Sequence, residues 1–405
     1  MRQEILKVNQ LTKLFGPGIE QGMDLLKQGY TKERLAKEKN ITVGVNRVSL
    51  DIREGEIFVI MGLSGSGKST LVRMLNRLIE PTGGEVLFHG QDLRKMSKSE
   101  LREVRRKSIS MVFQKFALFP HRTVLENVEY GLEVQKVAKS ERRSRAMSSL
   151  ELVGLKGWED RYPDQLSGGM QQRVGLARAL ANDPEVLLMD EAFSALDPLI
   201  RRDMQDELLE LQEKMKKTIV FITHDLDEAL RIGDRIALMK DGELIQIGTP
   251  EEMLTQPADR YVERFIEDVD LSKVLTASRV MRRPETVTPD RGPRVALELM
   301  RERGISNLFV IDRAKRLLGV ITAEDASRAL QTGKTLQDIL ITDGPCVSPD
   351  TLLNELFEVT SSARVPLAVV DDQHRLMGVI VRGAVLGALA GEVENKEVNG
   401  HELLA

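Results

Sequence analysis

The sequence predicts an α/β protein in which a larger domain is followed by a smaller, internally repeated α/β module. Three observations support this fold class. Short apolar runs typical of buried parallel strands alternate with helical stretches up to about residue 271. One such run, Ile57–Met61, leads directly into a glycine-rich loop and a helix. After about residue 272, one pattern of strands and helices occurs twice.

Length and composition limit the function classes. The 405 residues suit two or three domains, and 41% hydrophobic with 30% charged residues is typical of a globular protein with a real core. A net charge of −4 argues against a general nucleic-acid binder. The single cysteine, Cys346, excludes a disulfide framework and fits a reducing compartment. No apolar run approaches the ~18 residues needed to cross a bilayer, so a membrane role requires a partner.

The first domain is predicted to span residues 1–271. Ile57–Met61 reads as a buried strand, 69–78 as the helix after it, and 186–189 and Thr218–Thr223 as further buried strands. Residues 17–43 interrupt this pattern before it resumes near Val45. They contain two predicted helices, 21–27 and Lys32–Lys39, and Thr31 is a plausible N-cap of the second. This helical insertion is either a surface decoration or a docking element.

The glycine-rich loop after Ile57–Met61 has the pattern of a P-loop. Its glycines let successive backbone N–H groups turn onto phosphate oxygens, and the following helix adds its positive N-terminal end. Lys68 is expected to reach the β- and γ-phosphates of ATP, and the Ser69 hydroxyl to bind Mg²⁺. The loop residues predicted to bind the nucleotide are Gly62, Ser64, Gly65, Ser66, Gly67, Lys68, Ser69 and Thr70.

Polar residues at the ends of two other apolar strands complete a predicted hydrolytic site. Asp190 ends one strand, where a carboxylate holds Mg²⁺ through water. Glu191, the next residue, is placed to polarise the attacking water. His224 follows Thr218–Thr223 and is expected to contact the γ-phosphate, because ligands bind at the carboxyl ends of strands in open α/β sheets.

A second glycine turn, Leu166-Ser-Gly-Gly-Met170, opens another predicted helix. Ser167, Gly168 and Gly169 form a second anion site there. Two phosphate sites are redundant for a single nucleotide. The turn therefore indicates a site that serves the nucleotide of another subunit, and it disfavours a P-loop nucleotide kinase.

Together these motifs resemble the ATP-binding-cassette (ABC) ATPases over about residues 1–255, a P-loop fold with a helical subdomain. The resemblance implies that Phe15 stacks on adenine, that Gln114 touches Mg²⁺ and couples to the transport channel, and that Asp197 belongs to a loop communicating across a dimer. Family members dimerise head to tail, and each of two ATP molecules lies between the P-loop of one copy and the signature turn of the other. In this sequence the signature turn is the glycine turn at residues 166–170. Met170 departs from the glutamine of many members without removing the phosphate contacts.

One cassette without a membrane span disfavours exporters fused to their channel and relatives with two cassettes. The sequence around the P-loop, Met189–Arg201 and His224–Ala229 resembles the ATPase subunits of glycine betaine/proline betaine importers, as do the insertion and the C-terminal repeat. That resemblance implies an integral membrane permease, a second copy of the chain and a periplasmic or extracellular substrate-binding protein as partners. It also implies a peripheral position on the cytoplasmic side of the inner (plasma) membrane. A soluble regulatory ATPase, or an importer ATPase for another amine or amino-acid-like solute, remains the alternative.

The repeat covers predicted domains 272–335 and 336–390, and similar segments recur at an offset of 59 to 60 residues. Both copies resemble cystathionine-β-synthase (CBS) domains, which often bind adenine nucleotides, including cyclic dinucleotides. The first copy has the family's Thr and Asp, at Thr322 and Asp325, whereas the second has Val381 and Ala384. The sequence leaves open whether the pair binds a nucleotide, senses ionic strength, or is structural or dimerising. Residues 391–405 are predicted to be an acidic, disordered tail.

Overall fold

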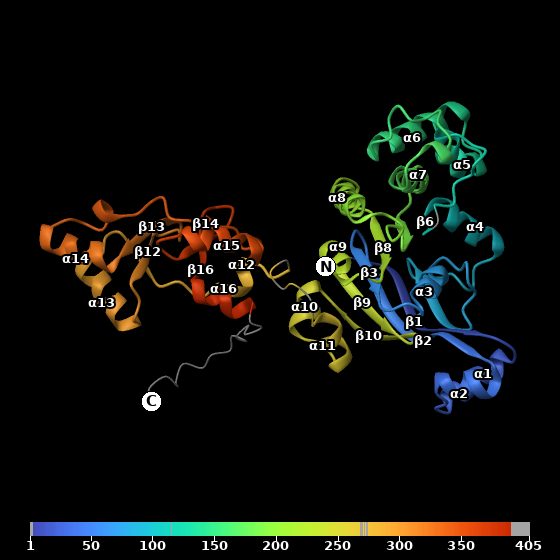
Figure 1. The fold of residues 1–405 in the computed structure, drawn as a ribbon, viewed down its shortest axis with the longest axis horizontal. Coiled ribbons are helices and arrows are strands. Elements are labelled where there is room, and N and C mark those ends of the chain that lie inside the picture. The colour runs from blue at the N-terminus through green and yellow to red at the C-terminus, as the bar shows by residue number, and fades with distance from the viewer. Residues whose placement is uncertain (1–2, 115, 268–269, 271, 273, 390–405) are drawn as a thin grey trace. The chain divides into compact units, whose positions relative to one another are not determined.

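The computed structural model describes residues 3–114, 116–267, 270, 272 and 274–389. The chain divides into two compact units, Met1–Val269 and Asp270–Ala405, each an α/β unit. Figure 1 shows the elements along the chain. The helices are α1 (Ile19–Lys27), α2 (Lys32–Lys39), α3 (Lys68–Leu75), α4 (Lys98–Lys107), α5 (Val124–Val134), α6 (Lys139–Leu152), α7 (Gly168–Leu180), α8 (Pro198–Met215), α9 (Leu226–Ile232), α10 (Pro250–Thr255), α11 (Arg260–Ile266), α12 (Ala277–Val280), α13 (Pro293–Arg303), α14 (Ala323–Thr332), α15 (Leu353–Ser362) and α16 (Arg382–Leu389).

A six-stranded sheet forms the centre of the N-terminal unit, in the order β10-β9-β3-β8-β7-β6. The strands are β3 (Ile57–Met61), β6 (Ile109–Val112), β7 (Val186–Asp190), β8 (Thr218–Thr223), β9 (Arg235–Lys240) and β10 (Glu243–Gly248). Neighbouring strands are parallel except β10 and β9. β3, β7 and β8 are buried throughout, which is why they read as continuous apolar runs. The three predicted strands are confirmed, and their carboxyl ends meet at one sheet edge.

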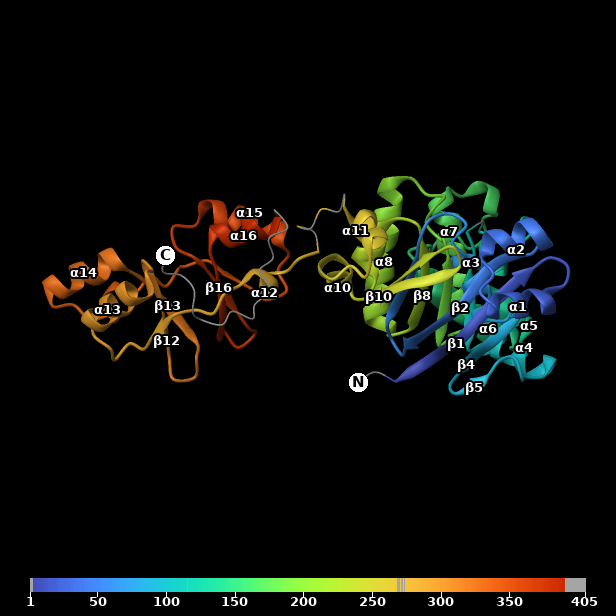
Figure 2. The same cartoon turned by 90° about the horizontal axis from the view of Figure 1, so that it is seen from below.

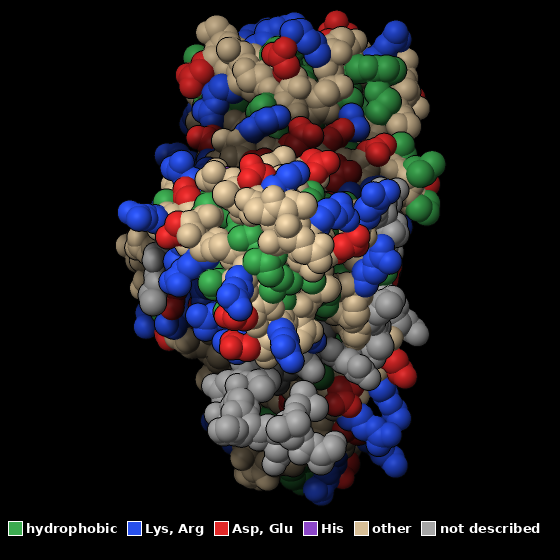
Figure 3. Space-filling model, turned by 90° about the vertical axis from the view of Figure 1, so that its left-hand side faces the viewer, with side chains coloured by type: hydrophobic (Ala, Val, Ile, Leu, Met, Phe, Trp, Pro, Cys, Tyr) green, Lys and Arg blue, Asp and Glu red, His purple; other side chains and the backbone are tan. Residues whose placement is uncertain are grey.

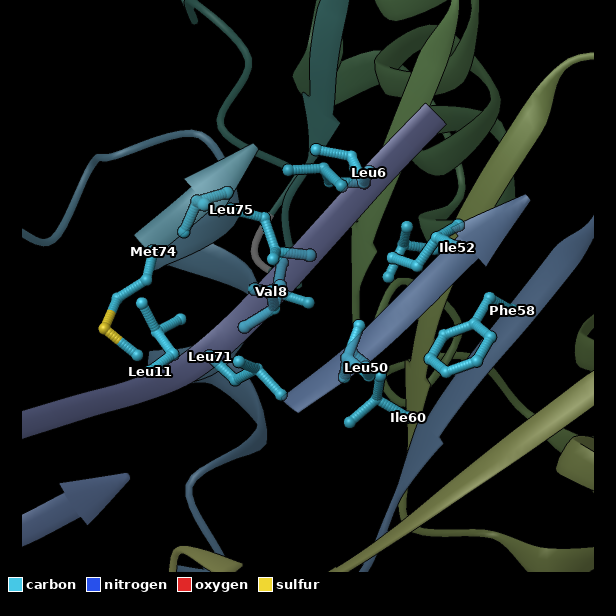
Figure 4. Packing of buried hydrophobic residues seen from close by; sticks show 14 of the residues in the cluster. Leu6, Val8, Leu11, Leu50, Ile52, Phe58, Ile60, Leu71, Met74 and Leu75 are labelled. Atoms are coloured by element: carbon cyan, nitrogen blue, oxygen red, sulfur yellow. The ribbon is translucent and has the colours of Figure 1, made fainter. Parts of the chain in front are cut away.

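A smaller antiparallel sheet in the order β2-β1-β4-β5 completes this unit. Figure 2 shows its strands side by side: β1 (Glu4–Phe15), β2 (Thr42–Arg53), β4 (Gly83–Phe88) and β5 (Gln91–Asp92). Its apolar side chains pack with those of β3 and α3, as Figure 4 shows. The residues labelled there are Leu6, Val8, Leu11, Leu50, Ile52, Phe58, Ile60, Leu71, Met74 and Leu75. This core fixes the start of α3, and with it the glycine loop, against the central sheet.

The helix after the loop is shorter than predicted. The predicted helix 69–78 ends at Leu75 in the structure, three residues early. The Asn76 side chain accepts a hydrogen bond from the Leu78 backbone N–H at 3.1 Å, and Arg77 takes a positive φ of 55°. A side chain that bonds the backbone two residues on competes with continued helix, and this local bond ends α3.

The predicted insertion is a pair of helices, α1 and α2, between β1 and β2. The Thr31 hydroxyl accepts a hydrogen bond from the Arg34 backbone N–H, which confirms Thr31 as the N-cap of α2. Apolar side chains of the helices pack on a small cluster that includes Leu14, Leu35 and Ile41. β2 resumes at Thr42, three residues before the predicted position.

The C-terminal unit contains two three-stranded sheets. One has β11 (Thr286–Val287), β12 (Asn307–Ile311) and β13 (Leu317–Thr322), and the other has β14 (Cys346–Val347), β15 (Leu367–Val370) and β16 (Leu376–Ile380). Each copy has the predicted order of strand, helix, strand, strand, helix. The predicted tail, residues 391–405, lies outside the described residues.

The two repeats exchange their leading segments. α12, at the start of the first repeat, packs into the core of the second, and Leu336, at the start of the second repeat, packs into the core of the first. Backbone hydrogen bonds of 2.8 to 3.0 Å join Arg282 to Val379 and Ile341 to Val320 in both directions. Glycine at 319 and 378 permits this approach, because a Cβ there would lie 2.5 Å from the Ile341 carbonyl oxygen or the Met281 sulfur. Each packed half therefore combines parts of both sequence repeats.

Asn127 on α5 anchors the segment between β6 and α5. It is fully buried, and its side chain accepts from the Phe119 N–H at 2.8 Å and donates to the Phe119, Arg122 and Thr123 carbonyls. Asn127→Ala leaves these backbone groups unpaired and is expected to cost about 1–3 kcal/mol of unfolding free energy. Thermal unfolding checks this. The half-buried Asn9→Ala is the control, and an equal loss of Tm in both variants would contradict the anchoring role.

Candidate functional site

The glycine loop between β3 and α3 is shaped by close backbone contacts. Gly62 and Gly67 have φ of 145° and 98°, and a Cβ at these positions would overlap the carbonyl oxygens of Met239 and Gly44, respectively. Gly67 is also the N-cap of α3. The loop therefore presents backbone N–H groups at a helix N-terminus, an arrangement suited to phosphate oxygens.

Gly67→Ala is expected to destabilise the protein by at least about 2 kcal/mol, since a positive φ and an overlap with the Gly44 carbonyl combine. Gly65→Ala is the matched control: φ is also positive at 80°, but no atom lies within 4 Å of the added Cβ. Its expected cost is only about 1 kcal/mol. Thermal unfolding compares the two, and equal Tm losses would show that the Gly44 contact does not matter.

Lys68 is 4% exposed, and its ammonium group donates to the Gly62 and Leu63 carbonyls at 2.8 and 3.1 Å. Burial lowers its pKa, while the nearby carboxylates of Glu191 and Asp190 oppose that change. The Glu191 carboxylate lies 3.9 Å from the Lys68 ammonium. A buried cation held by carbonyls at the mouth of the loop is suited to an entering polyphosphate.

Asp190 and Glu191 lie at the carboxyl end of β7. Asp190 is 2% exposed, and its Oδ2 accepts two hydrogen bonds from Arg73, from Nε at 3.1 Å and from an amino nitrogen at 2.9 Å. Glu191 has a positive φ of 48°, and its carbonyl accepts from the Ser194 N–H and hydroxyl. The Gln114 amide donates to the Glu191 carboxylate at 3.0 Å and to the Ser194 hydroxyl at 3.2 Å. The structure thus brings together Lys68, Gln114, Asp190 and Glu191, which come from distant parts of the sequence.

The remaining loop residues differ in exposure. Ser64 and Gly65 are exposed, whereas Ser69 and Thr70 are half-buried at the start of α3. The Ser66 hydroxyl is buried and has no hydrogen-bond partner among the described residues. Phe15 is 39% exposed, and the Lys13 ammonium lies 5.1 Å from its ring centre.

Five predicted site residues lie on other elements. Ser167 is exposed and caps α7, accepting from the Met170 N–H at 3.3 Å, with Gly168 and Gly169 in the first turn. Asp197 caps α8, and His224 is exposed after β8. Across the described residues, no hydrogen bond or ion pair joins 167–170 to the loop 62–70 of the same chain. The structure therefore leaves the signature turn separate from its own P-loop.

The predicted CBS residues are engaged with each other. The Thr322 hydroxyl donates to the Asp325 carboxylate at 2.7 Å and accepts from the Asp325 N–H, capping α14. An open cavity of about 680 Å³ lies instead in the second repeat, lined by Thr360, Arg364, Pro366, Ile380, Val381 and Arg382. On the face drawn in Figure 3, basic side chains lie among acidic and apolar ones, with no continuous basic field.

Arg73, the hydrogen-bond partner of Asp190, is not among the site residues predicted from the sequence. The available signal was its spacing, because Arg73 follows Ser69 by four residues on a helix and so shares its face. Asn127 was not predicted either, since a single buried asparagine has no signature in sequence.

A family model for ABC transporters matches residues 45–194, and a CBS domain model matches 277–332 and 336–391. A Bacillus subtilis strain 168 protein named glycine betaine transport ATP-binding protein OpuAA is 62% identical over 98% of this chain and 94% of its own length. The chain belongs to the ABC transporter ATPase family. An Escherichia coli strain K12 relative named glycine betaine/proline betaine transport system ATP-binding protein ProV is 50% identical, over 96% of this chain and 98% of its own length.

This ABC ATPase also resembles a solved structure of a dimeric ATP-binding cassette, MJ0796, in a post-hydrolysis state bound to ADP and phosphate. The identity is 36% and the TM-score 0.52, over 60% of this chain and 98% of the other. The ABC fold, the tandem CBS domains and the identity as an ATP-binding, ATP-hydrolysing subunit are thereby confirmed. Among the described residues, no helix is both long and apolar enough to span a membrane.

Proposed function

We propose that this ABC ATPase supplies the energy for import of quaternary-ammonium osmoprotectants such as glycine betaine and proline betaine. Its likeness to the betaine transport proteins over nearly the whole chain, insertion and CBS pair included, carries this proposal. The alternatives are another amine or amino-acid-like solute as cargo, or a soluble regulatory ATPase.

Two copies of the chain form the working ATPase in this proposal, each lending its signature turn to the nucleotide of the other. The support is geometric: Ser167, Gly168 and Gly169 stand apart from the P-loop of the same chain, exposed or half-buried at a helix N-terminus. We propose that Asp197, the N-cap of α8, faces the same partner copy. The Phe15 ring is exposed enough to stack on adenine.

The residues at the sheet edge fit a bound Mg²⁺. Ser69, Gln114 and Asp190 offer hydroxyl, amide and carboxylate oxygens, the donors that Mg²⁺ prefers, and Mg²⁺ characteristically uses one or two carboxylates beside substrate phosphates. When bound, Mg²⁺ neutralises charge on the phosphate oxygens. Glu191 accepts the proton of the attacking water, Lys68 binds the β- and γ-phosphate oxygens, and His224 contacts the γ-phosphate. The orphaned Ser66 hydroxyl marks a polar group available to a ligand.

The permease is proposed to dock at a groove beside Gln114. This groove has a volume of about 580 Å³ and is lined by Gln114, Phe116, Leu118, Pro120, Pro163 and Gln171. It touches the segment anchored by Asn127, and Gln114 reaches Glu191 directly, so one side chain connects groove and hydrolytic site. Docking to the permease would hold the protein at the cytoplasmic face of the membrane, with a substrate-binding protein on the other side.

We also propose that the CBS pair binds a regulatory nucleotide. Thr322 and Asp325 provide hydroxyl and carboxylate groups in the first repeat, and the open cavity in the second repeat carries Arg364 and Arg382. The proposed ligand is an adenine nucleotide or a cyclic dinucleotide. Regulation by ionic strength is the competing outcome.

Co-purification and transport test the proposal together. The tagged chain is purified from gently solubilised native membranes, and the complex is reconstituted in liposomes with its binding protein. We expect an integral membrane protein to co-purify and labelled glycine betaine to accumulate with ATP. A chain that brings down no membrane protein would favour the soluble regulator. Uptake of another amine, without betaine uptake, would assign that amine as the transported solute.

A further inference from the structure

Arg73 donates two hydrogen bonds to the carboxylate of Asp190 at the end of β7. Both of its hydrogen bonds, at 2.9 and 3.1 Å, go to Asp190 Oδ2. Oδ1 of the same carboxylate accepts no hydrogen bond from the part of the chain that the structure describes. The arginine side chain is 45% exposed and the aspartate side chain 3%, so Arg73 reaches inward to a buried charge.

The position of Arg73 on α3 ties this contact to the P-loop. Residues four apart on a helix lie one above the other, so Ser69 and Arg73 share a face of α3. That face meets the end of β7, because Arg73 bonds Asp190 there. One turn of α3 therefore connects the two proposed Mg²⁺ ligands. Ser69 lies at the start of this turn, and Arg73 at its end holds Asp190.

We infer that Arg73 is a positioning residue for the Mg²⁺·ATP site: it fixes Asp190 through Oδ2 and leaves Oδ1 for Mg²⁺ or its bound water. Two donors on one oxygen restrict rotation of the carboxylate, and the guanidinium balances its buried charge. An arginine serves this role better than a lysine, because its planar fork places both donors at once. The inference rests on the proposed function, since it takes the Mg²⁺ site as given.

The test measures nucleotide affinity on the full-length chain with a fluorescent ATP analogue, once with Mg²⁺ and once with EDTA. Arg73→Gln is expected to reduce the gain in affinity that Mg²⁺ provides by about tenfold or more, the usual effect of removing a partner of a metal ligand. Its affinity in EDTA is expected to match that of the wild type. Arg73→Lys should lose less of the Mg²⁺ gain, and Arg102→Gln, an exposed arginine on α4, should lose none.

A second readout uses Mn²⁺ as the metal. Its electron paramagnetic resonance spectrum in the presence of ATP should change in Arg73→Gln, and the change should vanish in an Asp190→Asn background, because the two residues act through one carboxylate. Arg73→Gln that keeps the full Mg²⁺ gain would overturn the inference. So would an equal loss of affinity in Mg²⁺ and in EDTA, which would indicate a purely structural role. If the wild type gains nothing from Mg²⁺, the proposed metal site itself fails.

Discussion

Replacing Glu191 with glutamine is expected to lower the rate of ATP turnover by a factor of ~10²–10⁴, while ATP binding persists. The substitution removes the carboxylate that accepts a proton from water but keeps the size of the side chain and a partner for Gln114. Because the chain still binds ATP, the ATP-bound dimer should accumulate. Phosphate release measures turnover, and size-exclusion chromatography with ATP measures the dimer.

Glu185→Gln is the matched control for this prediction. Glu185 immediately precedes β7, and its side chain is 46% exposed, paired with His89. It should keep the turnover of the wild type. A Glu191→Gln variant with undiminished turnover would contradict the assignment of Glu191 as the base and direct attention to His224.

Replacing Lys68 with alanine is expected to weaken both ATP binding and hydrolysis. A hydrogen bond to a charged group is worth about 1.5–3 kcal/mol, which corresponds to roughly 10- to 150-fold in affinity. The loss is large because Lys68 is buried and is the cation held at the loop carbonyls. Equilibrium binding of a fluorescent ATP analogue gives the affinity, and phosphate release gives the rate.

Lys95→Ala is the control for the loss of a positive charge. Its side chain is 81% exposed, so its removal should leave nucleotide affinity unchanged. If Lys68→Ala bound ATP as tightly as the wild type, the P-loop would not be the phosphate site. If both variants lost affinity equally, the effect would be one of net charge rather than of the loop.

Three strands of the central sheet, β3, β7 and β8, were predictable from sequence because they are buried throughout. Ile57–Met61 and Thr218–Thr223 have the predicted bounds, because every residue of these strands is buried and the apolar run therefore coincides with the strand. The end of α3 was not predictable, because it depends on a hydrogen bond from the Leu78 N–H to the Asn76 side chain. The exchange of segments between the CBS repeats was hidden as well, since it pairs residues as distant as Arg282 and Val379.

The candidate site likewise contains residues that could be predicted from the sequence and residues that could not. Motif spacing predicted that Lys68, Asp190 and Glu191 belong together, and the structure places Lys68 within 3.9 Å of Glu191. The roles assigned to these residues and to Phe15, Ser69, Gln114, Asp197 and His224 stay predictions. Arg73 was missed because an arginine on a helix has the sequence appearance of a solvated residue, and only the fold shows that it bonds Asp190. The Thr322 and Asp325 pair fits a helix cap as well as a nucleotide site, and sequence does not separate the two.

Solute uptake and ATP hydrolysis, measured together in one preparation, test the proposed import function. The chain, its permease and its binding protein are reconstituted in liposomes, and labelled glycine betaine and released phosphate are followed at several internal ionic strengths. If the chain energises betaine import, uptake of betaine depends on ATP and disappears in Glu191→Gln. Uptake that changes with internal salt would indicate osmotic gating of transport. Uptake that does not change would exclude only the proposed sensing of ionic strength by the CBS pair. Hydrolysis without any betaine uptake would contradict the proposed function.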